Sequence, residues 1–367
     1  MRHLSALLIA LSLLLPAAPA EAARRRTVQR SAEAFLPTAQ ADALAASALT
    51  AGTPGISIAV ANRGAIFARG YGHTTPARDA AVDTDTIFQI ASLTKQFTAA
   101  AILALEEDGR LSVSDPVMRW IPELDLGGRT VTLHQLLTHT SGLRTETEFL
   151  VDPYAPVAEA EMIRLIGTRG FVSEPGAAEA YNNAGYWLLG VVIERASGVP
   201  YARFLEQRFF VPLHLTRTAY CGTGPAVPVP AGSFELLGRA SLTHPVDMSI
   251  PGGAGAICST AADLVAWSRA LASGEAISTG SYQRMITPAR LTDGTLLDYG
   301  YGLGLGSIGG VFTTSHAGTI PGFESYMIDI PSRQVTVAVL VNAVSATRSW
   351  AREIARELAA ATLAGAP

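Results

Sequence analysis

Segments with strand character lie near both ends of this 367-residue chain, and mostly helical segments lie between them. Near the N-terminus, Gly55–Val60 and Ala65–Tyr71 flank an Asn-Arg-Gly turn and predict a β-hairpin. Clear strand patterns return at Val311–Ser315, Ser325–Ile330 and Val335–Val341. Because the two ends should share one layer, the sequence predicts an α+β fold. We expect an antiparallel sheet built from N- and C-terminal strands, flanked by helices, with a mostly helical inserted domain.

The order of these segments also predicts how the chain divides. An opening helix is expected around Ala32–Leu49 and a closing helix over Ala346–Leu363. Residues 23–85 and 292–367 should therefore form the sheet domain, and residues 86–291 the mainly helical domain. We expect the active site at the interface between these domains.

Three helices are predicted inside the helical domain from their start and stop signals. The first begins at Ser92 and ends before Gly109, and the second covers Ala184–Ala196. The third follows the capping residue Thr260 and ends near Gly274.

The N-terminal residues 1–22 have the features of an export signal. Arg2 precedes an apolar run, Leu4–Leu15, and the small residues Ala20 and Ala22 fit a cleavage site. This run is too short for a membrane span, which needs about 20 apolar residues. The sequence therefore predicts a cleavable signal peptide and a periplasmic or secreted protein with no stable membrane anchor after cleavage.

Charge and cysteine content narrow the function further. The formal net charge is −4 and the one basic cluster covers residues 24–26, so we expect no nucleic-acid partner. Cys221 and Cys258 are the only cysteines. Export would permit a disulfide, but no sequence pattern brings the two together, and two separate buried thiols are expected. The Pro/Gly-rich segment from Cys221 to Gly253 should be a long loop bordering the active site.

Lys95 is the only lysine in the chain, whereas all other basic residues are arginine. Arginine stays protonated in proteins, but a lysine amine can be tuned by its surroundings and can pass a proton. Lys95 follows Ser92 by one helical turn, so both side chains should lie on one face. At a helix start, the hydroxyl and N–H of Ser92 lie near the positive end of the dipole. The pair predicts a serine nucleophile with a proton-transfer lysine; a single surface lysine is the alternative.

Two other segments carry polar groups suited to the same site. Tyr181 can exchange protons with Ser92, and Asn183 can orient Lys95 or a substrate carbonyl. The alternative is a packed tyrosine followed by a helix N-cap at Asn183.

The third segment, His316-Ala317-Gly318-Thr319, ends a late strand. Its small residues allow close approach to a substrate, and the Thr319 N–H can complete an oxyanion hole with that of Ser92. The alternative is an ordinary strand end with a half-buried histidine.

The ordered set of Ser-x-x-Lys, Tyr-x-Asn and His-x-Gly resembles the serine β-lactamase and penicillin-binding-protein superfamily. The likeness is greatest to its class C β-lactamase, D-alanyl-peptidase and esterase branch, and it covers residues 42–363. Further similar segments include Leu-Leu-Thr-His-Thr-Ser-Gly-Leu at 136–143 and Gly-Tyr-Gly-Leu-Gly at 300–304. The resemblance implies a β-lactamase/transpeptidase-like fold.

The resemblance also implies a role for each motif residue. Ser92 would be the acylated nucleophile, Lys95 and Tyr181 would share proton transfer, and Asn183 would hold the lysine and the substrate. Backbone N–H groups of Ser92 and Thr319 would form the oxyanion hole.

Departures in the third motif bear on the substrate. His316 replaces the usual lysine and Ala317 the usual hydroxyl residue, so a substrate carboxylate would be held less well. We therefore expect an exported serine hydrolase that acts through an acyl-enzyme on a small ester or amide. One alternative is a D-alanyl-D-alanine carboxypeptidase or class C-like β-lactamase, which would take a peptide or β-lactam. A second is a non-catalytic protein that binds cell-wall fragments.

No cofactor or metal is expected. The glycine-rich segment Gly304–Gly309 precedes a strand instead of a helix, which favours a hairpin turn over a dinucleotide site. His134 and His139 lack a zinc-ligand pattern, and His139 is expected to brace the turn that follows it.

Overall fold

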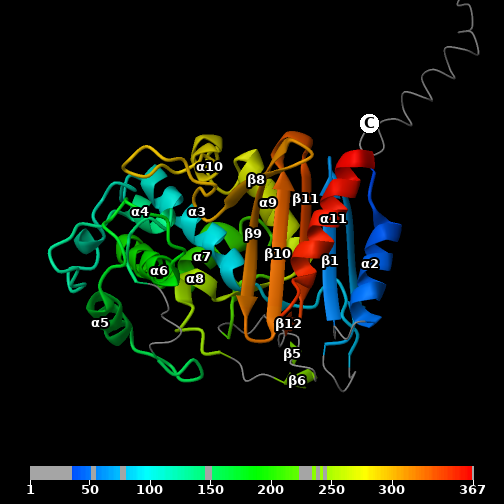
Figure 1. The fold of residues 1–367 in the computed structure, drawn as a ribbon, viewed down its shortest axis with the longest axis horizontal. Helices are drawn as coiled ribbons and strands as arrows, with labels where there is room; N and C mark the ends of the chain where they lie inside the picture. Colours follow the sequence, from blue (N-terminus) through cyan, green and yellow to red (C-terminus); the bar gives the residue numbers. More distant parts are fainter. Residues whose placement is uncertain are drawn as a thin grey trace, which may run out of the picture.

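The computed structural model describes residues 35–50, 55–74, 80–144, 151–222, 234–236, 240–242 and 246–365. The predicted signal peptide lies outside these residues, as does much of the loop expected to border the active site. The fold is α+β, as predicted, with helices flanking an antiparallel sheet (Figure 1).

Six strands form the main sheet in the order β2-β1-β11-β10-β9-β8, with every neighbouring pair antiparallel. The N-terminal strand β1 pairs with β11 near the C-terminus, so the two ends of the chain do share one sheet (Figure 1). The strands are Gly55–Asn62 (β1), Ala65–Gly72 (β2), Gly304–Ile308 (β8), Val311–Ile320 (β9), Phe323–Ile330 (β10) and Val335–Val341 (β11).

Two small three-stranded sheets complete the strand content of the described residues, in the orders β3-β7-β4 and β12-β5-β6. Their bounds are Phe88–Gln89 (β3), Ala219–Tyr220 (β4), Phe234–Leu236 (β5), Ala240–Leu242 (β6), Ile257–Ser259 (β7) and Ala343–Ser345 (β12).

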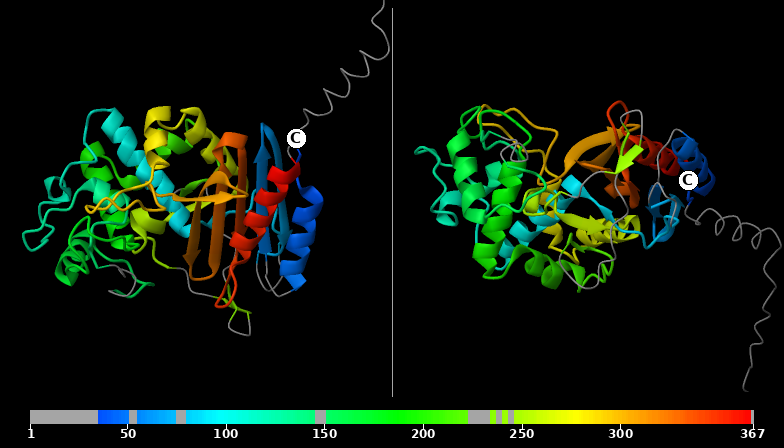
Figure 2. Two further views of the ribbon diagram at one scale, coloured as in Figure 1. Left: turned by 45° about the horizontal axis from the view of Figure 1, so that its top comes forward. Right: turned by 90° about the horizontal axis from the view of Figure 1, so that it is seen from below.

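Most helices lie between β3 and β8 in the sequence, and many of them pack beside the edge of the sheet at which β8 and β9 lie (Figure 1 and Figure 2). The described α-helices are Thr38–Thr50 (α2), Thr94–Glu107 (α3), Leu133–Leu137 (α4), Glu159–Arg169 (α5), Asn183–Ser197 (α6), Tyr201–Leu205 (α7), Gly252–Gly255 (α8), Ala261–Ser273 (α9), Thr279–Met285 (α10) and Trp350–Gly365 (α11). Shorter turns are the 3₁₀ segments Ala91–Leu93 (η1), Val117–Arg119 (η2) and Pro331–Arg333 (η5), and the π segment Glu206–Phe210 (η4). None of the helices in the described part of the chain has both the length and the hydropathy that a membrane crossing needs.

Strand β1 shows why the main sheet is covered on both faces. Ile56, Ile58 and Val60 pack into a core with α2 and α11, whereas Ala59 and Ala61 belong to the larger core shared with α3 and α6. Side chains alternate along a strand, so large residues face one helix layer and small residues face the other. Because both faces of β1 are buried, its sequence is mostly apolar and does not alternate regularly with exposed polar residues.

One strand of the main sheet was missing from the sequence prediction, as were the short strands of the two small sheets. Residues 304–308 were expected to form a glycine-rich turn but form β8, which pairs with β9 from Gly304↔Ser315 to Ile308↔Val311. The turn lies at Gly309 and Gly310, both with positive φ. Glycine weakens the local strand signal, so this strand depends on its pairing with β9.

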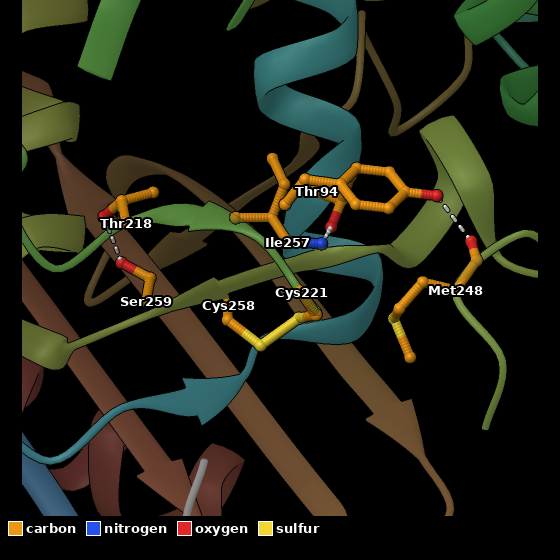
Figure 3. Close-up of a disulfide and its surroundings, with 8 residues drawn as sticks. Thr94, Thr218, Cys221, Met248, Ile257, Cys258 and Ser259 are labelled. Carbon is orange, nitrogen blue, oxygen red and sulfur yellow. Dashed lines mark hydrogen bonds between the residues drawn. A yellow bond between two sulfur atoms is a disulfide. The ribbon is translucent and has the colours of Figure 1, made fainter. Parts of the chain in front are cut away.

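The prediction of two separate thiols was wrong, because Cys221 and Cys258 form a disulfide (Figure 3). Strand β4 pairs with β7, and the Cys221 N–H donates to the carbonyl of Ala256 at 2.8 Å. These strands have two and three residues, too short for a periodic sequence signal. Their pairing sets the cysteine Cα atoms 5.1 Å apart, within the range that a disulfide spans.

Removing this disulfide should lower the free energy of unfolding by about 2–4 kcal/mol, because it closes a loop of considerable length in the unfolded chain. The double substitution Cys221→Ala and Cys258→Ala tests this by urea denaturation. Reductant should destabilise the natural protein but leave the double variant unchanged. Equal stability of the two proteins without reductant would contradict the prediction.

Candidate active site

Ser92 lies in the 3₁₀ turn η1, between β3 and α3. The sequence prediction of an α-helix that begins at Ser92 was therefore two residues early, since α3 starts at Thr94. The preceding residue, Ala91, has a φ of 48°, in a region that non-glycine residues seldom occupy. This sharp turn brings the Ser92 side chain to the wall of a cavity.

The Lys95 side chain is completely buried and its Nζ atom has a hydrogen-bond acceptor on three sides. Nζ donates to Ser92 Oγ at 3.0 Å, to Asn183 Oδ1 at 2.8 Å and to the carbonyl of Ala254 at 2.9 Å. An ammonium group has three N–H donors, so this set of acceptors matches the protonated amine. The acceptors come from η1, α6 and α8, which are far apart in the sequence.

Tyr181 reaches the same hydroxyl from the loop before α6. Its phenol donates to Ser92 Oγ at 2.8 Å, and Lys95 Nζ lies 4.8 Å from its ring centroid. The tyrosine is 44% exposed, because one side of its ring faces the open cavity. The structure thus brings the polar ends of Ser92, Lys95 and Tyr181 into hydrogen-bond contact.

The two asparagines after Tyr181 have different contacts. Asn182 is buried and caps α6, accepting a hydrogen bond from the Gly185 N–H at 2.7 Å. Asn183 is left to accept from Lys95. The alternative in which Asn183 is the N-cap is therefore wrong, and the neighbouring amide has that role.

Strand β9 brings His316, Ala317 and Thr319 to the wall of the same cavity, next to the serine turn. Gly318 lies between them and contacts η1 closely. A Cβ atom at this position would lie 2.3 Å from the carbonyl oxygen of Ile90 and 3.0 Å from the Ser92 nitrogen. Only glycine allows β9 to approach the serine turn this closely.

A cavity of about 430 Å³, large enough for a small organic ligand, is lined by the predicted site residues Ser92, Tyr181, Asn183, His316, Ala317 and Thr319. The cavity also contacts Tyr299 and Arg352, which the sequence analysis did not single out. Arg352 projects from α11, and its guanidinium lies 5.5 Å from the ring centroid of Tyr326. Within the described residues, no group of His, Cys, Asp and Glu side chains is arranged to hold a metal ion.

A hydrogen-bonded series of buried aromatic side chains runs from the cavity wall, at His316 and Tyr299, to His139 in the interior. His139 Nε2 is 3.2 Å from the Tyr299 hydroxyl, which is 2.9 Å from His316 Nε2. The expected role of His139 as a brace for the following turn was too narrow. Its ring also lies against that of Tyr181, with centroids 4.4 Å apart, and its φ of 59° is unusual for a histidine. His139 and Tyr299 lie in or beside two segments that carried the family resemblance, which was the available signal.

His139 and His316 are both held in their neutral form. Burial and the nearby charge of Lys95 lower the pKa of His316 to about 3. Burial, Lys95 and His316 hold the pKa of His139 well below its usual value. Neutral histidines leave Lys95 as the cation in contact with Ser92.

The fold is β-lactamase/transpeptidase-like, and the arrangement around Ser92 is of the kind expected in the serine hydrolase superfamily. The solved structure of the octameric penicillin-binding protein homologue from Pyrococcus abyssi matches it with a TM-score of 0.78 and 27% identity, covering 90% of this chain and 78% of that one. The Beta-lactamase family model matches residues 33–362, and the chain belongs to this family. The resemblance inferred from the motifs is thereby confirmed.

Two curated relatives are similar over most of this chain. Putative penicillin-binding protein PbpX of Bacillus subtilis (strain 168) is 30% identical over 79% of this chain and 71% of its own length. A D-aminopeptidase of Gluconobacter oxydans (strain 621H) is 28% identical over 82% of this chain but only 58% of its own length. The chain thus spans little more than half of the second relative.

Replacing Lys95 by arginine should lower kcat/KM by at least about 10²-fold, because arginine cannot release its proton and its planar head does not fit three convergent acceptors. Arg119→Lys, in an exposed ion pair with Asp115, is the matched control and should retain full activity. Steady-state kinetics of both variants makes the comparison, and near-normal turnover by Lys95→Arg would exclude a proton-transfer role for the amine.

The substitution Gly318→Ala should push β9 away from η1 and misplace backbone donors beside Ser92. Loss of one such donor costs about 10²–10³-fold in kcat. Gly306→Ala on β8 is the control, since its Cβ would meet only Thr313 Oγ1 at an ordinary 3.6 Å. Equal rates for these two alanine variants would show that the close approach at Gly318 has no part in catalysis.

Proposed function

We propose that this protein is an exported serine hydrolase that acts on a small ester or amide through an acyl-enzyme. The observation that carries the proposal is the convergence of Lys95 and Tyr181 on the Ser92 hydroxyl at the wall of an open cavity. The character of residues 1–22 supports export to the periplasm or the medium.

In the proposed reaction, the Lys95–Tyr181 pair first releases one proton to the solvent in the cavity, and the pair then accepts and shares the proton that leaves Ser92 Oγ. The oxygen then attacks the substrate carbonyl, and the tetrahedral oxyanion accepts hydrogen bonds from the Ser92 and Thr319 N–H groups. The cation of Lys95 stabilises negative charge on the Tyr181 oxygen, and Asn183 keeps Lys95 in place. The proton passes to the leaving alcohol or amine as its bond to the carbonyl carbon breaks.

Release of the enzyme repeats these steps with water. Tyr181 accepts a proton from the water that attacks the Ser92 ester, and the proton returns to Ser92 Oγ as the acid product leaves. The 44% exposure of Tyr181 supports this second role, because water can reach it from the cavity.

The third motif favours a substrate without a carboxylate next to the scissile bond. His316 is buried and neutral, and Ala317 presents a methyl group to the cavity instead of a hydroxyl. The D-aminopeptidase among the relatives supports an amide as the scissile group. A D-alanyl-D-alanine carboxypeptidase or class C-like β-lactamase is the second candidate, and the Arg352 guanidinium on the cavity wall favours it because it can attract a carboxylate.

Mass spectrometry after treatment with a fluorophosphonate tests the acyl-enzyme chemistry. We expect one adduct, on the peptide that contains Ser92, and none in the Ser92→Ala variant, which should have no turnover. A natural protein that stays unlabelled and inactive would favour the alternative of a non-catalytic binder of cell-wall fragments.

A substrate panel tests the proposed specificity. A chromogenic ester and a D-amino acid amide should be hydrolysed with higher kcat/KM than a cephalosporin or a D-alanyl-D-alanine peptide. Enzyme-like rates on the cephalosporin alone would establish the second candidate instead.

A further inference from the structure

The hydrogen bonds between His139, Tyr299 and His316, together with two backbone groups, indicate where the proton lies on each histidine ring. At one end, the backbone N–H of Asn182 donates to His139 Nδ1 at 3.0 Å. A neutral imidazole has one donor and one acceptor nitrogen, so His139 Nε2 must carry the proton and donate to the Tyr299 oxygen.

The contacts of His316, at the other end of this hydrogen-bonded series, give the same direction for the protons. His316 Nδ1 is 2.6 Å from the backbone carbonyl of Ala317, which can only accept, so Nδ1 carries the proton of this ring. His316 Nε2 is then the acceptor and takes the hydroxyl proton of Tyr299 at 2.9 Å. A backbone N–H and a backbone carbonyl thus place the two histidines in opposite tautomers.

This order leaves His316 without an N–H group for a ligand. Its only donor is directed at the Ala317 carbonyl, and its other nitrogen is occupied by Tyr299, although the residue lines the cavity. A carboxylate placed against His316 would therefore meet ring C–H groups and an acceptor nitrogen, and would lose water without gaining a hydrogen bond.

We infer that Tyr299 is a specificity-determining residue: by donating its hydroxyl proton to His316, it makes this wall of the active site select substrates whose leaving group is uncharged. The inference rests on the proposed function and names its substrate class. Tyr299 does not contact the Ser92 hydroxyl in this scheme; it acts through the tautomer of His316.

The groups that surround His139 and His316 are consistent with the neutral form of both rings. The rings of Tyr181, Tyr186 and Tyr299 surround His139, while Tyr181 and Tyr299 flank His316. Lys95 supplies the positive charge that disfavours protonation of either histidine, and the Glu179 carboxylate helps to raise the pKa of Tyr299. Arg352 lines the same cavity, but its guanidinium lies 5.5 Å from the ring centroid of Tyr326 and makes no hydrogen bond with His316 or Tyr299 among the described residues, so a carboxylate bound there would not need His316.

Nitrogen NMR of the natural protein tests the proton order without relying on catalysis. Long-range ¹H–¹⁵N spectra should show His139 protonated at Nε2 and His316 at Nδ1, with both rings neutral at pH 6 and pH 8. Each ring is assigned by comparison with a His139→Gln or His316→Gln variant. A His316 ring that is protonated at Nε2, or at both nitrogens, would overturn the inference.

The substitution Tyr299→Phe tests the consequence for specificity. It frees His316 Nε2 to take up a proton and donate to a carboxylate, and a charge-assisted hydrogen bond is worth roughly a tenfold gain in affinity or more. Tyr301→Phe is the matched control, because Tyr301 is similarly buried and its hydroxyl contacts His134 Nδ1 at 2.8 Å, away from the cavity lining.

The readout is the ratio of dissociation constants for N-acetyl-D-alanyl-D-alanine and its C-terminal amide, measured in the Ser92→Ala background. Binding preference should shift about tenfold towards the carboxylate in the Tyr299→Phe protein, more strongly at pH 6 than at pH 8, and stay unchanged with Tyr301→Phe. An unchanged ratio in Tyr299→Phe, or no binding of either ligand, would refute the inference. Because this background has no turnover, failure of the proposed hydrolysis would be seen separately in the natural protein.

Discussion

The buried ammonium group of Lys95 is the constraint on which the rest of the site depends. A charge with no solvent exposure costs several kcal/mol unless its hydrogen bonds are satisfied. Ser92, Asn183 and Ala254 satisfy them, and they come from three separate segments of the chain. The fold can bury this lysine only when η1, the start of α6 and α8 meet at one point. The packing that buries Lys95 therefore also brings the candidate catalytic groups together.

The segment that contains Ala254 is tied to the serine turn by further contacts. The Ile257 N–H donates to Thr94 Oγ1 at 3.1 Å, and the Ile90 N–H donates to the Ile257 carbonyl at 3.0 Å. The adjacent Cys258 is bonded to Cys221, which fixes β7 against β4 (Figure 3). The disulfide therefore supports the lysine acceptor indirectly, through the short sheet beneath the active site.

Electrostatics in the site follows from having one buried cation among neutral aromatic groups. Burial and the charge of Lys95 keep His139 and His316 unprotonated, and burial raises the pKa of Tyr186 and Tyr299 well above the usual value for tyrosine. In the proposed reaction, negative charge that develops near Ser92 would be balanced by Lys95 and backbone N–H groups. The same neutral wall is the basis for our proposal that His316 does not bind a carboxylate.

The sequence by itself determined the sheet built from both chain ends, because strand patterns occur there. It also predicted that Ser92, Lys95 and Tyr181 would meet at one place, because their residue types and order are specific, and their polar ends do meet. Strand β8, the disulfide and the buried role of His139 were decided only by tertiary structure. Glycine-rich or two-residue strands have no periodic signal, and they exist because a partner strand satisfies their backbone. The direction of the proton between two histidines depends on which backbone groups face them, and that is a property of the folded chain alone.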